Sequence, residues 1–247
     1  EIDDLICNTL GGMTGYLITP LFVFFIPKRE RLDEIAYSRG EIVSEFRRIV
    51  AWIIDIALII APVVGFFVFN KEIMNGDIVG YKLISTFLIS DFATPIAKFI
   101  TNFGGAIFLT VLTIILFILI KNKKIGLSIF SNLVIITALN QLKNILQRPR
   151  PTEYRIIEET GYSFPSGHSM ISMAFYGYII YLIYKYVKNK YIKWFSIVLL
   201  SILICSIGIS RIYLGVHYTS DVLGGFSISI SYLVIYISAV NKFFIEK

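Results

Sequence analysis

The chain has 247 residues, of which 56% are hydrophobic and only 16% are charged, and its mean hydropathy is +0.74. This composition excludes an ordinary soluble domain and is typical of a chain that lies mostly in lipid or inside a bundle of membrane helices. The net charge of +6 would suggest nucleic-acid binding in a soluble protein. We predict no nucleic-acid partner, because the cations here follow the pattern of membrane topology.

The first 48 residues are predicted to form a separate N-terminal region. The chain begins with Glu1, so we expect a fragment or a processed form. An apolar run at residues 10–26 predicts one span, which leads into a basic cytoplasmic linker at residues 28–48. Residues 1–5 and 8–12 resemble the end of VanZ-like membrane proteins. We expect a plain anchor helix here and assign no catalytic work to this region.

Residues 49–247 are predicted to form one helical core. Roughly 20 helical residues cross the hydrocarbon layer, and apolar runs of about this length recur along the chain without the alternation of barrel strands. Asp55 lies in the first run, where a carboxylate is costly, and a functional role and pairing inside the bundle are both open. The sequence predicts an all-α, polytopic membrane helix bundle with one N-terminal span and a six-span core, whose spans lie near residues 49–69, 103–120, 125–142, 168–187, 194–210 and 219–240.

Lysine and arginine cluster in four segments that alternate along the chain with the other connections. Residues 28–48 hold six, residues 121–124 hold three, residues 185–193 hold four, and residues 242–247 hold two. The positive-inside rule places all four clusters in the cytoplasm. The three polar motifs described next then fall on the extracytoplasmic face.

The first motif is a group of three cations, Lys143, Arg148 and Arg150. Pro149 and Pro151 interrupt any helix there, so the side chains can converge on one anion, and arginine adds bidentate geometry. Such a cluster could instead anchor a span at the lipid head groups. The anchor is the weaker interpretation, because the cluster falls on the face where positive charge is not expected.

The second motif is Phe-Pro-Ser-Gly-His at residues 164–168, directly before an apolar run, and it is predicted to open a membrane helix. Unpaired backbone N–H groups and the helix dipole attract anions at such an end. Ser166 can cap the helix or donate to an anion, Gly167 lets the backbone approach closely, and His168 follows them. Taken alone, this stretch fits better with a turn that carries a surface histidine, and only the other two motifs change that interpretation.

The third motif joins two apolar runs: Ser210 and Arg211 end the first, and His217 and Asp221 begin the next. If the helix includes His217, the i, i+4 spacing places imidazole and carboxylate on one face. A carboxylate on one ring nitrogen holds the tautomer and leaves the other nitrogen free to attack. The pair could instead bind a metal, although a metal site would need more His, Asp or Cys ligands than this face offers.

Together the three motifs resemble the signature of the type 2 phosphatidic acid phosphatase (PAP2) superfamily in residue type, spacing and order. The resemblance implies a six-helix membrane core and a two-step phosphatase that needs no metal and no cofactor. It implies that His217 attacks phosphorus to form a phosphohistidine while Asp221 orients it, and that His168 protonates the leaving oxygen and then activates water. The phosphate oxygens would be held by Lys143, Arg150, Ser166, Gly167 and Arg211, with assistance from Arg148.

The same resemblance implies a multi-pass lipid phosphatase of the bacterial cell membrane whose active site faces outside. The tail of the substrate would stay in the bilayer while its phosphate reaches the cations. We favour undecaprenyl diphosphate, and phosphatidic acid and phosphatidylglycerol phosphate are the alternatives. Two other functions are open: vanadium-dependent haloperoxidases resemble the same motifs but are soluble proteins, and a lipid-binding or transport protein would keep the pocket without turnover.

Overall fold

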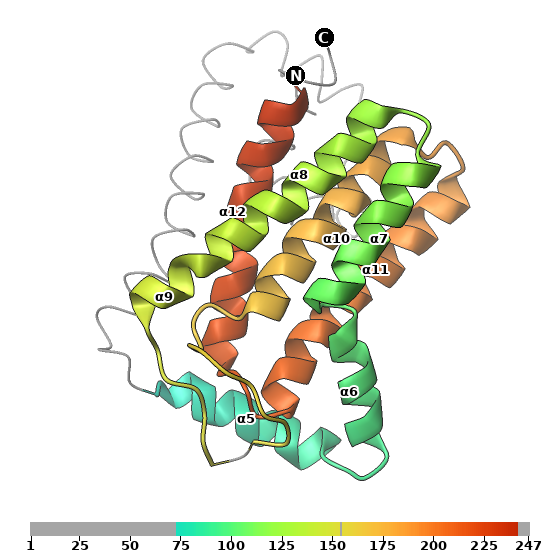
Figure 1. Cartoon of the computed structure of the whole chain (residues 1–247). Helices are drawn as coiled ribbons and strands as arrows, with labels where there is room; N and C mark the ends of the chain where they lie inside the picture. Colours follow the sequence, from blue (N-terminus) through green and yellow to red (C-terminus); the bar gives the residue numbers. More distant parts are fainter. Residues whose placement is uncertain (1–72, 154, 242–247) are drawn as a thin grey trace, which may run out of the picture.

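The computed structural model describes residues 73–153 and 155–241, and this part of the chain consists of helices and connections without a strand (Figure 1). The predicted all-α fold is confirmed. Residues 10–26 and 49–69, Asp55, the boundary at residue 48 and the VanZ-like stretches lie outside the described residues. The helices are α5 Asn75–Leu88, α6 Ala93–Asn102, α7 Ala106–Leu119, α8 Lys123–Leu139, the 3-10 helix η1 Asn140–Leu142, α9 Lys143–Leu146, α10 Gly167–Tyr186, α11 Lys190–Tyr213 and α12 Thr219–Val240.

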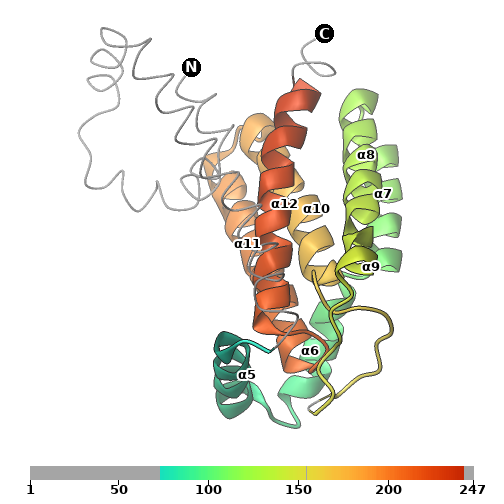
Figure 2. The same ribbon diagram turned by 90° about the vertical axis from the view of Figure 1, so that its left-hand side faces the viewer.

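Helices α7, α8, α10, α11 and α12 stand side by side and form a bundle (Figures 1 and 2). Helix α10 packs against α8, α11 and α12 and lies at the centre. Its buried Phe175, Tyr178 and Leu182 join Leu109 of α7 and Leu233 of α12 in one apolar cluster. Because all five helices contribute side chains to this cluster, burial of apolar surface fixes their relative positions.

Three helical stretches are long and apolar enough to cross a membrane, namely Lys123–Leu146, Lys190–Tyr213 and Thr219–Val240, and the bent pair of α6 and α7 makes a fourth if it counts as one span. Among the described residues, the predicted span near 168–187 is a helix but does not pass this test of length and composition. Its serine, glycine and tyrosine residues lower its hydropathy. Helix α10 tolerates them because it packs mainly against other helices. Small and polar residues are more favourable at such contacts than on a surface that faces lipid.

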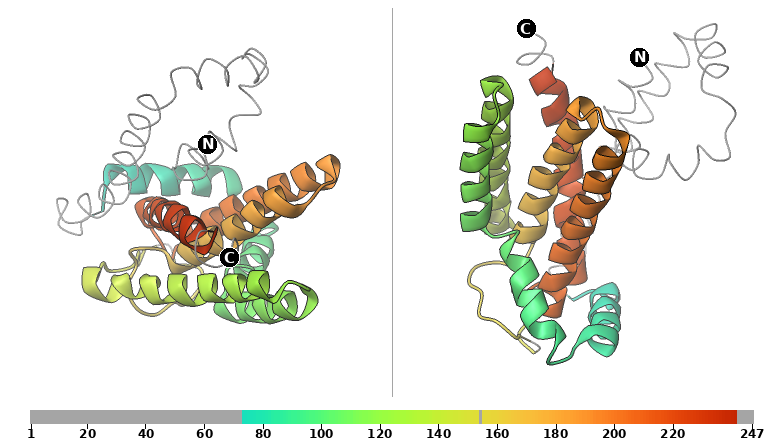
Figure 3. Two further views of the ribbon diagram at one scale, coloured as in Figure 1. Left: turned by 90° about the horizontal axis from the view of Figure 1, so that it is seen from above. Right: turned by 90° about the vertical axis from the view of Figure 1, so that its right-hand side faces the viewer.

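Helices α5 and α6 were not predicted, and they lie beyond the bundle at one of its ends (Figure 1). Helix α5 runs across the bundle axis and contacts α11 and α12 (Figure 3). Helix α6 meets α7 at a bend of 49°, at a break that contains Gly104 and Gly105. A Cβ on Gly104 would lie 2.8 Å from the side chain of Ile207, so a larger residue there would force the bend or Ile207 on α11 to shift.

Helix α12 packs closely on the start of α10 through Gly224 and Gly225. A Cβ on Gly225 would lie 3.0 Å from the carbonyl oxygen of Ser166, and one on Gly224 would lie 2.5 Å from the ring of Phe164. Small residues permit this approach. The Ser166 N–H then donates to the carbonyl oxygen of Asp221 at 3.1 Å, which joins the second motif to the third.

Two basic clusters fall within the described residues, and both lie at the same end of the bundle. Residues 121–124 include the turn between α7 and α8, and residues 185–193 include the turn between α10 and α11. The start of α10 and the connection between α11 and α12 lie at the opposite end, next to α5 (Figure 1). The motifs and these basic turns are therefore separated by the length of the bundle.

Candidate active site

The first motif lies where the helix that includes α8 and α9 ends. Helix α9 stops at Leu146, and Gln147 takes a left-handed conformation with a φ of 52° before the two prolines. This confirms the predicted break. Lys143 is the first residue of α9, and its Nζ lies 3.3 Å from the position that a Cβ on Gly167 would take. The ammonium group of Lys143 therefore lies over the start of α10.

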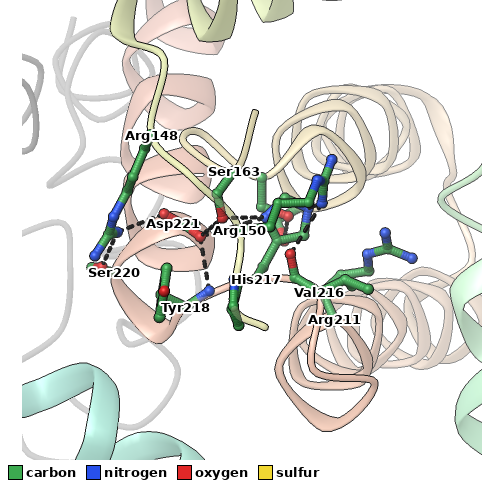
Figure 4. Close-up of polar contacts among 12 residues, drawn as sticks. Arg148, Arg150, Ser163, Arg211, Val216, His217, Tyr218, Ser220 and Asp221 are labelled. Carbon is green, nitrogen blue, oxygen red and sulfur yellow. Dashed lines mark hydrogen bonds and ion pairs between the residues drawn. The ribbon is translucent and has the colours of Figure 1, made fainter. Parts of the chain in front are cut away.

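Arg150 is buried and is held by three backbone carbonyl groups. Its Nε donates to Gly161, its Nη2 to Thr160 and its Nη1 to Val216, each at 3.0 Å. Its Nη1 also lies 3.1 Å from Nε2 of His217 (Figure 4). These bonds tie the loop after α9 to the connection between α11 and α12, and they hold the guanidinium group against the histidine.

The second motif opens α10, as predicted. Ser166 is the N-cap residue and Gly167 is the first helical residue, but the Ser166 hydroxyl lies 2.9 Å from the hydroxyl of Ser169 and does not cap the backbone. His168 is half-buried in the first turn. Its charged and titratable neighbours come from every motif and from the loop before it, and they are Arg211, Glu159, His217 and Lys143.

In the third motif, α12 begins at Thr219, two residues after His217. The predicted pair forms even so, because Nδ1 of His217 lies 3.5 Å from Oδ2 of Asp221. That oxygen also accepts hydrogen bonds from the Tyr218 N–H at 2.8 Å and from the Ser163 hydroxyl (Figure 4). A carboxylate at Nδ1 favours the tautomer with its proton on Nδ1, so the lone pair is on Nε2, beside Arg150.

The buried environment keeps His217 in its neutral form. Burial lowers the pKa of His217 to about 4, although the hydrogen bond and the charge of Asp221 act in the opposite direction. The ring is therefore uncharged at neutral pH. An imidazole with a supported Nδ1–H and a free lone pair on Nε2 has the arrangement of a nucleophile or a general base.

Arg211 is buried at the end of α11 and contacts a residue that the sequence analysis missed. Its Nη2 donates to Oε2 of Glu159 at 2.5 Å, and its Nη1 donates to the hydroxyl of Thr101 at 2.9 Å. Burial raises the pKa of the Glu159 carboxyl, but Arg211 outweighs this effect and holds the pKa below its ordinary value. Glu159 is therefore a carboxylate at neutral pH and lies among the cations.

Arg148 points to the other side of Asp221. Its Nη1 donates to Oδ1 of Asp221 at 2.6 Å and to the Ser220 hydroxyl at 2.7 Å, and its Nη2 donates to Oδ2 of Asp77 at 2.8 Å. The guanidinium group lies over the ring of Tyr218, 4.3 Å from its centre. This arrangement differs from the expected one, in which Arg148 helps to hold phosphate, because both terminal nitrogens already donate to protein oxygens.

The site thus gathers Lys143, Arg150, Arg211, His168 and His217 around the start of α10. Arg148 and Asp77 lie behind Asp221. The sequence analysis missed Asp77, Ser163 and Glu159, and the only signal for the last two was their position between two motifs. Within the described residues, no three His, Cys, Asp or Glu side chains come together as a possible metal site. Convergent cations, a helix N-terminus and a buried neutral histidine can bind a phosphate and attack it.

Comparison with known proteins finds matches to the part of the chain that contains the three motifs. Residues 121–245, which include all three, match the PAP2 superfamily. Phosphatidylglycerophosphatase B of Bacillus subtilis (strain 168) is 41% identical over 91 residues, which are 36% of this chain and 44% of that protein. Undecaprenyl-diphosphatase of Sulfolobus acidocaldarius is 26% identical over 182 residues, which are 70% of this chain and 80% of that protein.

The fold also has a counterpart among solved structures. The crystal structure of a transmembrane PAP2-type phosphatidylglycerolphosphate phosphatase from Bacillus subtilis superposes with a TM-score of 0.65 at 27% identity. The superposition covers 76% of this chain and 98% of that structure. The match with the first relative above spans less than half of that relative's length.

Proposed function

This chain belongs to the PAP2 superfamily, and we propose that it is a membrane lipid phosphatase that works through a phosphohistidine on His217. The observation that carries the proposal is the environment of this histidine: Nδ1 faces Asp221 at 3.5 Å and Nε2 faces Arg150 at 3.1 Å. One nitrogen is supported by a carboxylate, and the other is directed toward cations that would attract a phosphate group.

In the proposed first step, Nε2 of His217 attacks phosphorus, the bond from phosphorus to the leaving oxygen breaks, and protonated His168 gives that oxygen a proton and becomes neutral. In the second step, neutral His168 takes a proton from water, the water oxygen attacks phosphorus, and the bond to Nε2 breaks. Asp221 orients His217 and stabilises the positive charge that the ring gains. The two steps divide a barrier that is among the highest known for hydrolysis.

Lys143, Arg150, Ser166, Gly167 and Arg211 are proposed to hold the phosphate oxygens. The cations neutralise the charge on these oxygens, and the backbone at the start of α10 donates to them. An incoming phosphate would take over the bond between Arg150 and His217 and would compete with Glu159 for Arg211. No step in this scheme is assigned to a metal or a cofactor.

The substrate is proposed to be a lipid phosphate or diphosphate at the extracytoplasmic face of the cell membrane. Support for the side comes from the two basic turns, which lie at the far end of the bundle from the motifs. Undecaprenyl diphosphate is our first candidate. It is supported by the match to an undecaprenyl-diphosphatase, which covers 70% of this chain. Phosphatidylglycerol phosphate is the second, supported by the more identical but shorter match and by the superposed structure.

The test is phosphate release by the detergent-purified protein in EDTA, from undecaprenyl diphosphate, phosphatidylglycerol phosphate and phosphatidic acid. We expect turnover that survives EDTA, and an acid-labile phosphoenzyme when a substrate labelled at phosphorus is quenched rapidly. His217→Ala is expected to abolish both signals while it elutes as a folded protein. Turnover at the wild-type rate by His217→Ala would contradict the assignment, and vanadate binding without turnover by the wild type would favour a binding protein.

A further inference from the structure

We propose that Asp77, acting through Arg148, is a positioning residue that preserves the negative charge of Asp221 for His217. The inference rests on the phosphohistidine function proposed above and assigns a part in it to α5. Asp77 lies outside the residues that match the family, and no motif includes it.

The three charged side chains form a continuous buried row. Arg148 bridges Asp77 at 2.8 Å and Asp221 at 2.6 Å, and the side chains of Arg148 and Asp77 are each only 1% exposed. On the far side of Asp221, the other carboxylate oxygen faces His217 at 3.5 Å. The row therefore runs from α5 through the loop after α9 to the start of α12 and ends at the candidate nucleophile.

Asp77 is placed firmly enough to fix Arg148. Its Oδ1 accepts a hydrogen bond from the Ser220 N–H at 2.8 Å, and its Oδ2 accepts one from the Met74 N–H at 3.2 Å. The second bond comes from the residue that precedes α5. It caps the start of this helix and restricts the Asp77 side chain to one orientation. Arg148 in turn donates to Asp77 and lies over the ring of Tyr218, and the two contacts together restrict the orientation of the guanidinium group.

The charge balance of this row gives Asp77 its proposed role. With Arg148 and Asp221 alone, a buried guanidinium would cancel the carboxylate that His217 needs. Asp77 supplies a second carboxylate to the same guanidinium, so the row keeps one excess negative charge. Charges interact strongly when they are buried, and this excess would stabilise the ring of His217 as it becomes positive during attack on phosphorus.

Asp77 could instead be only a tether between α5 and α12, and the two roles predict different results. Asp77→Asn keeps an oxygen that can accept from the Ser220 N–H but removes the charge. If the charge matters, kcat should fall about tenfold, less than for loss of a carboxylate in direct contact with the histidine. KM should stay unchanged or fall, because a substrate anion would meet less negative charge. A tether role predicts kcat and KM close to those of the wild type.

A second comparison removes the Asp77 charge from a protein that already lacks the Arg148 guanidinium. In Arg148→Gln the guanidinium charge is absent, so Asp77 no longer balances anything and only repels Asp221. We therefore expect Arg148→Gln with Asp77→Asn to be no slower than Arg148→Gln alone. A further loss of kcat in the double variant would overturn the proposal, and so would a wild-type kcat for Asp77→Asn. Asp77→Asn alone leaves a buried guanidinium with one carboxylate fewer and could fail to fold for that reason, whereas the double variant contains no such guanidinium and can still be compared with Arg148→Gln.

The controls separate failure of this inference from failure of the function. Asp91→Asn removes an exposed carboxylate from the connection between α5 and α6, at the same end of the molecule, and should leave kcat and KM unchanged. Active wild type, inactive His217→Ala and fully active Asp77→Asn would overturn only the role of Asp77. Inactive wild type, or active His217→Ala, would overturn the function itself. Elution volume and melting temperature in detergent report whether each variant is folded.

Discussion

Glu159 places a carboxylate among the cations that are proposed to receive phosphate. It contacts Arg211 at 2.5 Å, and its charge also acts on Arg150, Lys143 and His168. A carboxylate in this position can stand in for one phosphate oxygen when the site holds no substrate. Its side chain is 31% exposed, whereas that of Arg211 is 1% exposed, so Glu159 is the partner with room to move aside.

Glu159→Gln should therefore strengthen the binding of inorganic vanadate, an analogue of the phosphate transition state. Removal of the charge leaves Arg211 without a competing anion, and an effect of about tenfold corresponds to roughly 1.4 kcal/mol. Titration of vanadate inhibition measures the change. Glu158→Gln, one residue away with a side chain that is 98% exposed, is the matched control. Weaker vanadate binding in Glu159→Gln than in this control would show that Glu159 assists the anion and does not compete with it.

At the scale of single residues, the sequence predicted the groups that lie within motifs and missed those that reach the site from irregular segments. His168, His217 and Asp221 stand at fixed spacings beside apolar runs, so their chemistry could be inferred. Glu159 comes from a loop with no periodicity, and its contact with Arg211 depends on how that loop folds back. Arg148 was identified as a cation, but its direction depends on Asp77, which is 71 positions away in the chain.

At the scale of helices, the contact between α12 and α10 brings the second and third motifs together. Gly225 faces backbone atoms at the start of α10, with the Ser166 carbonyl oxygen 3.0 Å and the Met170 nitrogen 3.2 Å from the position of a Cβ. Backbone atoms in two packed helices cannot shift as a flexible side chain can. Even a methyl group at Gly225 would therefore push apart the elements that carry Ser166 and Asp221.

Gly225→Ala is accordingly expected to destabilise the protein by about 1–3 kcal/mol and to lower kcat at least severalfold, because a misplaced site loses rate steeply. Melting temperature in detergent and phosphate release measure the two effects. Gly76→Ala is the control, since a Cβ on Gly76 meets nothing within 4 Å and alanine is a better helix former than glycine. Equal behaviour of the two variants would contradict the role of the close helix contact.

The helices themselves were predictable where they are long and apolar. Helices α7, α8, α11 and α12 follow the predicted runs, and α10 does so although serine and tyrosine residues interrupt its apolar run. Helices α5 and α6 were missed because they are short and polar residues interrupt them, so their apolar residues do not form a run of spanning length. The position of α5 beside the third motif could not be read from the sequence, since it depends on the contact between Asp77 and the start of α12.

At the scale of the whole molecule, the two ends of the bundle differ in charge and in chemistry. Lys188 is exposed in the turn between α10 and α11, and Glu158 is exposed in the loop at the motif end. The turn between α10 and α11 lies at one end of the bundle, and the start of α10, which follows the loop with Glu158, lies at the other (Figure 1). If the bundle spans the membrane as proposed, one position faces the cytoplasm and the other faces outside.

Single cysteines at these two positions test the orientation. In a background with Cys7→Ser and Cys205→Ala, we expect Glu158→Cys to react with a membrane-impermeant thiol reagent in intact cells. Lys188→Cys should react only after the cells are made permeable, because the proposed orientation follows the positive-inside rule and puts the basic turns in the cytoplasm. The reverse pattern would place the active site inside and would exclude substrates confined to the outer leaflet.

The bonds that build the site connect distant parts of the chain: Arg148 and Asp221 are 73 positions apart, and Thr101 and Arg211 are 110 apart. A ribosome therefore delivers the cations of the first motif and His168 well before it delivers His217 and Asp221. A chain cut before His217 would have the cations of the first motif and His168, but it would lack the proposed nucleophile and the Asp221 carboxylate that orients it. Hydrolysis would therefore become possible only once the connection that carries His217 and the start of α12 that carries Asp221 have packed beside α10.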